Sequence, residues 1–150
     1  MAAIPEGFHT LTPHLTVTDA KAAIAHYEAA LGARNLGIAT APGSDKVMHA
    51  MLEIGSSRLF INDEMPGMGA NAPKGDGAGA HFYVYVEDVD AAHDRAVGAG
   101  MSEKHAPQDM FWGDRTSVVA DRYGQVWTFA THVREVSEAE MAEAMKTFGS

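Results

Sequence analysis

The chain contains an internal repeat, which limits the folds it can adopt more than any other feature. The segment "TPHLTVTDAKAAIAHYEAALGA" begins at Thr12, and "HFYVYVEDVDAAHDRAVGAGM" begins at His81, 69 residues later (81 − 12). At this offset the apolar positions of the two segments coincide, and Gly55 of "EIGSSRLFIN" falls on Gly124 of "RYGQVWTFAT". A unit of this size cannot cover both faces of its own sheet. We therefore expect two similar modules that pack against each other.

Each half of the chain has the pattern of a strand, a helix and further strands. Asp19 and Asp88 stand where a side-chain oxygen can cap the start of a helix, and Gly32 is a typical helix end. "KVMHAMLEI" and "RLFIND" flank the turn "GSS", and "FWGDRTSVVAD" and "QVWTFATH" flank the turn "RYG", as hairpin strands do. These patterns predict an α+β fold of two βαβββ modules, whose curved mixed sheets surround a cavity.

We expect residues 1–150 to form a single domain. Its parts are module one at about 8–64, a linker at 65–79, module two at 80–132 and a C-terminal helix at 137–148. The linker region "EMPGMGANAPKGDGAGA" holds five glycines and two prolines and shows no periodicity. Ser137 and Glu140 fit a capping box, and Met141, Met145 and Phe148 then share one helix face. This helix is expected to dock on its own domain, with exchange onto a second subunit as the alternative.

Charge and composition exclude several classes of partner. The net charge is −9, with eleven basic residues spread along the chain, which argues against binding to nucleic acid or to an anionic membrane. No apolar run reaches the roughly 18 residues of a membrane span, and "MAAIPEGFH" lacks the pattern of a signal peptide. The chain has no cysteine, so disulfides and thiolate metal sites are absent. We expect a cytoplasmic protein with a small-molecule partner.

Alternation along the strands separates a packed face from a face available to a ligand. Leu15, Val17, Val84 and Val86 should pack beneath the helices, which leaves polar and aromatic side chains on the other face. In "DMFWGDR", a flat aromatic and a guanidinium could hold a conjugated or charged molecule, although a surface Asp-Arg pair beside a packed Trp112 is equally consistent. The candidate ligand-binding residues are His14, His49, Met51, Glu53, His81, Tyr83, Tyr85, Trp112, Asp114, Arg115 and Thr128.

The repeat and its motifs resemble the vicinal oxygen chelate superfamily, which includes glyoxalase I, dioxygenases and bleomycin-resistance proteins. "VMHAMLEIG", "INDEMPGMG", "HFYVYVEDVDAA", "FWGDR" and "DRYGQVWTFATH" are similar to its PhnB-like branch. The resemblance covers residues 10–132. It implies the glyoxalase/bleomycin-resistance fold and a homodimer, and it leaves the function open because this fold carries many chemistries.

In metal-dependent members of the superfamily, four ligands come from the first and last strands of the two modules. The resemblance places these positions at Thr12, Leu59, His81 and Thr128. One imidazole and two hydroxyls do not make a transition-metal site, which needs three or four strong donors. We therefore expect no cofactor and no metal at the usual positions. A divalent ion held by His14, His49, Glu53 and His81 is the alternative.

The sequence favours a binding protein over an enzyme. No Gly-x-Ser-x-Gly motif and no phosphate-binding glycine loop before a helix occurs, and no catalytic residue can be assigned. The expected function is to bind a small, flat or partly apolar molecule in the inter-module cavity without the usual metal. The alternative is a metal-dependent lyase, isomerase or dioxygenase of glyoxalase type that uses the other histidine set.

Overall fold

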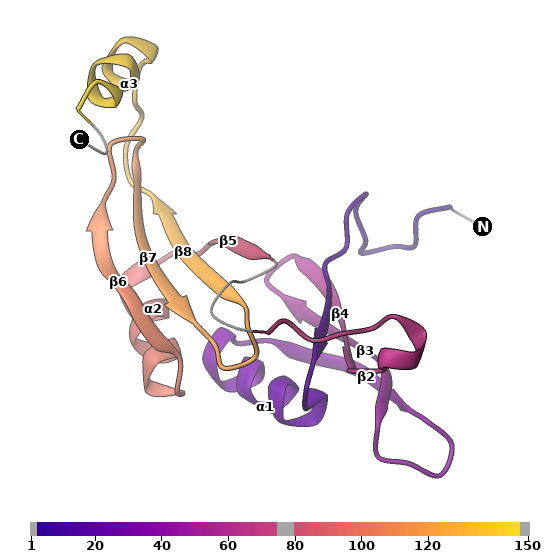
Figure 1. Cartoon of the computed structure of the whole chain (residues 1–150). Helices are drawn as coiled ribbons and strands as arrows, with labels where there is room; N and C mark the ends of the chain where they lie inside the picture. Colours follow the sequence, from indigo (N-terminus) through magenta and orange to yellow (C-terminus); the bar gives the residue numbers. More distant parts are fainter. Residues whose placement is uncertain (1–2, 75–79, 148–150) are drawn as a thin grey trace.

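The computed structural model describes residues 3–74 and 80–147, which form two four-stranded mixed sheets and three α-helices (Figure 1). The first module comprises β1 (His14–Val17), α1 (Ala20–Leu31), β2 (Arg34–Thr40), β3 (Val47–Ile54) and β4 (Ser57–Asp63). The second comprises β5 (His81–Tyr85), α2 (Val89–Gly98), β6 (Ser102–Asp109), β7 (Asp114–Ala120) and β8 (Val126–His132). A short 3-10 turn, Pro66–Met68, lies between the modules, and α3 (Glu138–Met145) follows them.

The two modules share one topology. The strand order is β1-β4-β3-β2 in the first sheet and β5-β8-β7-β6 in the second. In each sheet the first strand runs parallel to the last, and the remaining neighbours are antiparallel. The predicted α+β fold of two βαβββ modules is therefore confirmed. None of the helices in the described part of the chain is long and apolar enough to cross a membrane.

Both module helices begin at the predicted aspartates. The side chain of Asp19 accepts a hydrogen bond from Ala22 N at 3.1 Å, and Asp88 does the same for Ala91 N at the same distance. These bonds satisfy backbone donors that have no partner inside the helix. Helix α1 ends at Gly32, whose φ of 68° is a left-handed conformation that glycine adopts without steric cost.

A buried polar contact joins the modules where α1 lies beside α2. Tyr27 of α1 is fully buried, and its hydroxyl donates to Asp121 Oδ2 of the second module at 2.7 Å. Trp127 Nε1 donates to the same oxygen at 2.9 Å, and its ring packs edge-on against Tyr27. Arg95 of α2 also donates to the carbonyl of Ala29 in α1. The helix sides of the two sheets therefore meet within one chain.

The C-terminal helix differs from the other two because none of its residues is buried. Its predicted capping box is present: Glu140 N donates to Ser137 Oγ, and Ser137 N donates to Glu140 Oε1. In Figure 1, α3 lies at the far end of the second module, away from the first. Phe148, and residues 75–79 of the predicted linker, lie outside the described residues.

Candidate functional site

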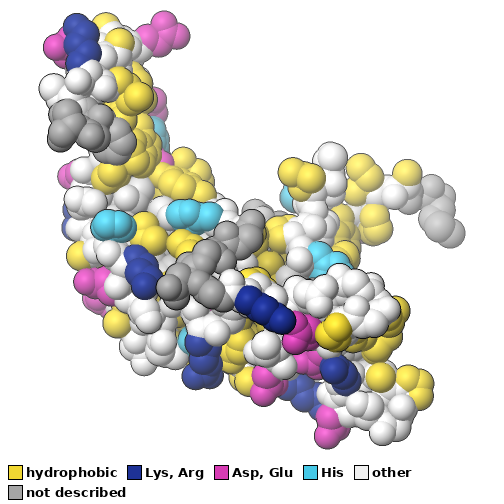
Figure 2. Space-filling view, viewed as in Figure 1, with side chains coloured by type: hydrophobic (Ala, Val, Ile, Leu, Met, Phe, Trp, Pro, Cys, Tyr) yellow, Lys and Arg dark blue, Asp and Glu magenta, His cyan; other side chains and the backbone are white. Residues whose placement is uncertain are grey.

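The side of the second sheet that faces away from α2, which we call its open face, carries most of the predicted ligand-binding residues. Along β5, Phe82 and Val84 pack toward the hydrophobic core, so His81, Tyr83 and Tyr85 project from the open face. The imidazole Nε2 of His81 lies 2.6 Å from Thr128 Oγ1 on the adjacent strand β8. In Figure 2, histidine and hydrophobic side chains share the flank of the second module that leads toward α3.

A buried carboxylate organises this face. Asp114, at the start of β7, is only 3% exposed. Its Oδ2 accepts hydrogen bonds from the hydroxyls of Tyr83 at 2.7 Å and Tyr85 at 2.9 Å. Its Oδ1 lies 2.8 Å from Nδ1 of His132, which is its direct neighbour on β8. Trp112 extends the network, because its Nε1 donates to the hydroxyl oxygen of Tyr83 at 3.1 Å.

The network sets the ionisation of its members. Burial opposes the charge on Asp114, but the hydrogen bonds from Tyr83, His132 and Tyr85 together outweigh it and lower the pKa of this carboxyl. Burial, followed by the bond to Asp114, raises the pKa of Tyr83 to about 12. The bond to Asp114 likewise raises the pKa of Tyr85. At neutral pH the carboxylate is therefore ionised and both phenols keep their protons.

The same arrangement favours the protonated form of His132. Its Nδ1 bonds to Asp114, and its Nε2 lies 3.1 Å from Glu135 Oε1. The bond to Asp114, and then the bond to Glu135, raise the pKa of His132 above its ordinary value. An imidazolium bound on both nitrogens by carboxylates is a poor general base.

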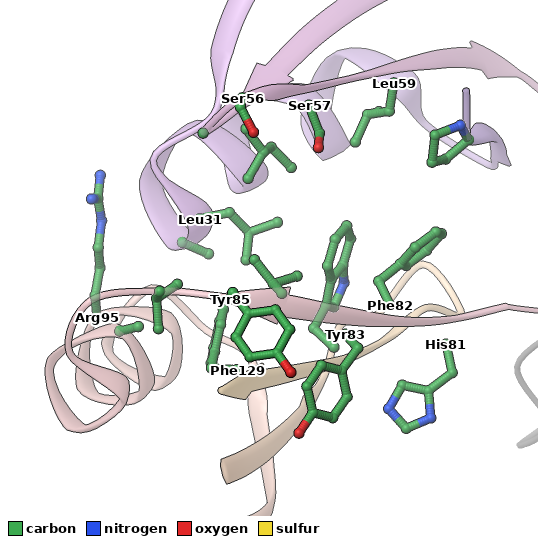
Figure 3. Close-up of a pocket in the computed structure, with 18 of the residues that line it drawn as sticks. Leu31, Ser56, Ser57, Leu59, His81, Phe82, Tyr83, Tyr85, Arg95 and Phe129 are labelled. Atoms are coloured by element: carbon green, nitrogen blue, oxygen red, sulfur yellow. The ribbon is translucent and has the colours of Figure 1, made fainter. Parts of the chain in front are cut away.

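A cleft of about 760 Å³ runs between the modules along β5. Strand β5 is an edge strand, paired with β8 on one side, so its other edge is open to the cleft. Figure 3 shows Leu31, Ser57 and Leu59 of the first module across from β5, with Phe82 pointing toward them. Tyr83 and Tyr85 also line the cleft, and they are 45% and 65% exposed. They therefore connect an apolar slot with the polar network on the open face.

Four other predicted residues lie on the first sheet. His14, His49 and Met51 surround the ring of Phe60: the His49 and His14 rings lie 4.6 Å and 5.9 Å from it, and Met51 is its cross-strand neighbour. Glu53, on the same face, forms ion pairs with Arg34 and Arg58. The predicted ligand-binding residues thus fall into two groups, one on each sheet.

Strand register corrects one of the four positions to which the resemblance pointed. His14 lies opposite Phe60, 46 positions further on (60 − 14), whereas His81 lies opposite Val126, only 45 further on (126 − 81). The offset between the last strands is therefore 68 rather than 69, so Thr128 corresponds to Phe60. Leu59 is instead buried in the core on the other face.

The corrected set does not fit a transition metal. Thr12, Phe60, His81 and Thr128 offer one imidazole, two hydroxyls and no carboxylate, and a stable site needs three or four N, O⁻ or S⁻ donors. The alternative set is divided between two sheets, with His14, His49 and Glu53 on the first and His81 on the second. Within residues 3–74 and 80–147, no three His, Asp or Glu side chains lie close enough together to hold a metal ion.

Arg115, another of the predicted residues, lies on the helix side of the second sheet, away from the open face. Successive residues of β7 alternate between faces, so Arg115 points toward α2 while Asp114 points to the open face. Its guanidinium binds Asp90 of α2 at 2.9 and 3.0 Å and Asp109 of β6 at 3.1 Å. The guanidinium is therefore committed to an ion-pair network on the helix side, and only Asp114 and Trp112 of "DMFWGDR" join the tyrosines.

Several residues of the site were not predicted. Phe60 and His132 fall on the correct face by strand alternation, so the register of β4 and β8 was the missing information. Leu31, Phe82 and Phe129 line the cleft, although their apolar character is that of core residues. No pattern in the sequence separates an apolar residue of a cleft wall from one of a closed core.

Comparison with known proteins agrees with this architecture. Residues 7–129 match the model of the Glyoxalase/Bleomycin resistance protein/Dioxygenase superfamily. The chain is 39% identical over 144 residues to an uncharacterized protein of Mycobacterium bovis, covering 93% of each. It is similar to the crystal structure of TioX from Micromonospora sp. ML1, with a TM-score of 0.67, 26% identity, and coverage of 83% of this chain and 99% of TioX. A gene product of Arabidopsis thaliana gives a TM-score of 0.66 at 26% identity, with 82% and 98% covered. The chain belongs to the glyoxalase/bleomycin resistance protein/dioxygenase superfamily.

Proposed function

We propose that the protein binds a small, flat, partly apolar molecule in the cleft along β5 and does so without a metal ion. The observation that carries this proposal is the composition of the cleft. Leucine and aromatic side chains line much of it, and the hydroxyls of Ser56 and Ser57 and the guanidinium groups of Arg58 and Arg95 supply polar groups. A volume of about 760 Å³ lies within the range of about 300–1,000 Å³ that is usual for small-molecule sites.

The donor set supports binding without a metal. The residues at the positions where the superfamily holds metal have too few strong donors, and His81 is engaged with Thr128. A ligand would instead be held by apolar contact with Leu31, Leu59 and Phe82 and by hydrogen bonds with polar lining groups such as Ser57. Contact with flat rings favours a flat ligand, because such rings stack over a large area.

The proposal also covers the branch of the superfamily to which the chain belongs, its location in the cell and its oligomeric state. We place it in the PhnB-like branch, on the motifs around residues 47–55 and 111–132, and we expect it to act as a cytoplasmic homodimer. The edge strands β2 and β6 and the unburied helix α3 offer surface to a second subunit.

A dye titration tests the proposal. N-phenyl-1-naphthylamine is neutral and flat, and its fluorescence increases in apolar surroundings. We expect saturable binding at one site per chain. A Ser57→Trp substitution, which places a large ring in the cleft from an exposed position, should weaken this binding at least about tenfold, or about 1.4 kcal/mol.

The matched control is Ser44→Trp, in the exposed turn before β3 and outside the cleft. This variant adds the same side chain and should leave the dye affinity unchanged. Equal affinity in the wild type and Ser57→Trp would contradict binding in the cleft.

A further inference from the structure

Strand β5 presents unpaired backbone groups at its free edge. The N–H and C=O groups of one strand residue point to the same edge, and successive residues alternate between the two edges. Val86 N donates to Ala130 O of β8 at 2.8 Å, so Val84, two residues earlier, also faces β8. The N–H and C=O groups of Tyr83 and Tyr85 therefore point to the other edge, where no strand of the described residues pairs with them.

The cleft lies along this free edge. Every residue from His81 to Val86 lines it, on both faces of the sheet alike, as is expected when the edge of the strand forms a wall. In Figure 3, β5 runs across the view, with Leu31 and Ser57 of the first module on the other side of the cleft. Unpaired backbone groups at a sheet edge bind a partner that offers a complementary donor and acceptor. A ligand with an amide group can therefore pair with the main chain of β5.

The charged side chains along the cleft are cationic. Among the described lining residues, the only Asp, Glu, Lys or Arg residues are Arg58 and Arg95. Arg58 shares the carboxylate of Glu53 with Arg34, so this group keeps a net positive charge. Arg95 donates to two main-chain carbonyls of α1 and makes no ion pair within the described part of the chain. Although the chain as a whole is acidic, the cleft itself favours a ligand with an anionic group.

We propose that the cleft takes an N-acyl amino acid, with its flat acyl group in the apolar part and its polar end along β5. The amide N–H donates to Tyr83 O, and the carboxylate accepts from Tyr85 N–H, as one residue of a parallel neighbouring strand does. In Figure 3, Arg95 lies toward the Tyr85 end of β5, where its charge attracts the carboxylate. This inference rests on the proposed function, because it names the class of molecule that the cleft binds.

Three ligands with the same ring test the two polar contacts separately. N-(2-naphthoyl)glycine has both groups, 2-naphthoyloxyacetic acid has an ester oxygen in place of the amide N–H, and N-(2-naphthoyl)glycinamide has no charge. Their affinities are measured at pH 7 by displacement of N-phenyl-1-naphthylamine. We expect naphthoylglycine to bind at least about tenfold more tightly than the ester-linked acid, because an ester oxygen cannot donate to Tyr83 O. It should also bind several-fold more tightly than the neutral glycinamide.

Substitutions at Tyr85 test the backbone contact from the side of the protein. Tyr85→Pro removes an N–H that no bond between strands uses, at an edge position where proline is tolerated. Tyr85→Ala removes the same side chain and keeps the N–H. We expect Tyr85→Pro to bind naphthoylglycine about tenfold more weakly than Tyr85→Ala, with circular dichroism to confirm that both variants are folded.

Equal affinity of the wild type for the amide and the ester-linked acid would overturn the inference while dye binding in the cleft still stood. Equal affinity of the two folded Tyr85 variants for naphthoylglycine would overturn it as well. If Tyr85→Pro does not fold, the comparison of the three ligands on the wild type decides. Failure of the dye and of all three ligands to bind would overturn both proposals.

Discussion

At the residue scale, Asp114 shows how one buried carboxylate can organise one face of a sheet. Its burial would favour the neutral acid, yet three donors on two neighbouring strands keep it ionised. In return, the carboxylate accepts the protons of both tyrosine hydroxyls and favours the protonated form of His132. A change in any one member therefore alters the donor and acceptor pattern of the open face.

His132 gives this network a pH dependence. Its pKa in the folded protein is raised, so its contribution to stability is fully present below the ordinary histidine pKa of about 6.5. The contribution is lost as the pH rises through the folded-state pKa. We expect His132→Asn to reduce the free energy of unfolding more at pH 5.5 than at pH 8.5.

Urea denaturation of the wild type and the variant at these two values of pH measures the effect. Asp114 contributes equally to the free energy of unfolding at both values of pH. Its pKa is lowered, so its contribution is present above the ordinary carboxyl range and is lost only at more acidic pH. A larger loss at pH 8.5 than at pH 5.5 would mean that folding does not raise the pKa of His132.

At the element scale, the two turn glycines of the repeat allow a matched comparison. Gly55 joins β3 to β4 and Gly124 joins β7 to β8, and both have positive φ, at 58° and 92°. A side chain at Gly55 would meet open space, whereas a Cβ at Gly124 would lie 2.8 Å from Pro73 Cβ. We expect Gly55→Ala to cost about 1 kcal/mol, from backbone strain alone, and Gly124→Ala clearly more.

Thermal or urea unfolding of both variants checks this prediction. The difference between them reports the contact with Pro73 together with the greater backbone strain at the φ of 92°. Equal destabilisation would show that the segment before β5 moves aside at no cost.

The elements also show which parts of the fold could be predicted. Helices α1 and α2 follow from their aspartate caps and apolar stripes, and β1, β3, β4, β5, β7 and β8 from alternation. Strands β2 and β6 could not be located, because they are edge strands with nearly every residue exposed and so lack an alternating pattern. The sequence also does not show that the pairing of β1 with β4 differs by one residue from the pairing of β5 with β8. This difference decides that Phe60, and not Leu59, lies on the open side of the first sheet.

At the scale of the whole molecule, the modules join through their helix sides while β5 and α3 remain open. Helix α3 has a complete capping box, yet none of its residues is buried within the chain. Short isolated helices are marginal in water, so a second subunit is the natural source of contacts for it. We expect a homodimer, with a mass by light scattering near twice 16.0 kDa at micromolar concentration. A particle of 16.0 kDa would contradict this.

The central claim is that the cleft binds its ligand without a metal ion, and dye affinity before and after chelation tests it most directly. The dissociation constant of N-phenyl-1-naphthylamine is measured on one preparation as purified, after EDTA and dialysis, and after addition of Zn²⁺ or Ni²⁺. Because Thr12, Phe60, His81 and Thr128 make a poor donor set, we predict the same dissociation constant in all three states. Loss of binding on chelation, with recovery on adding metal in the wild type but not in His81→Ala, would contradict the account.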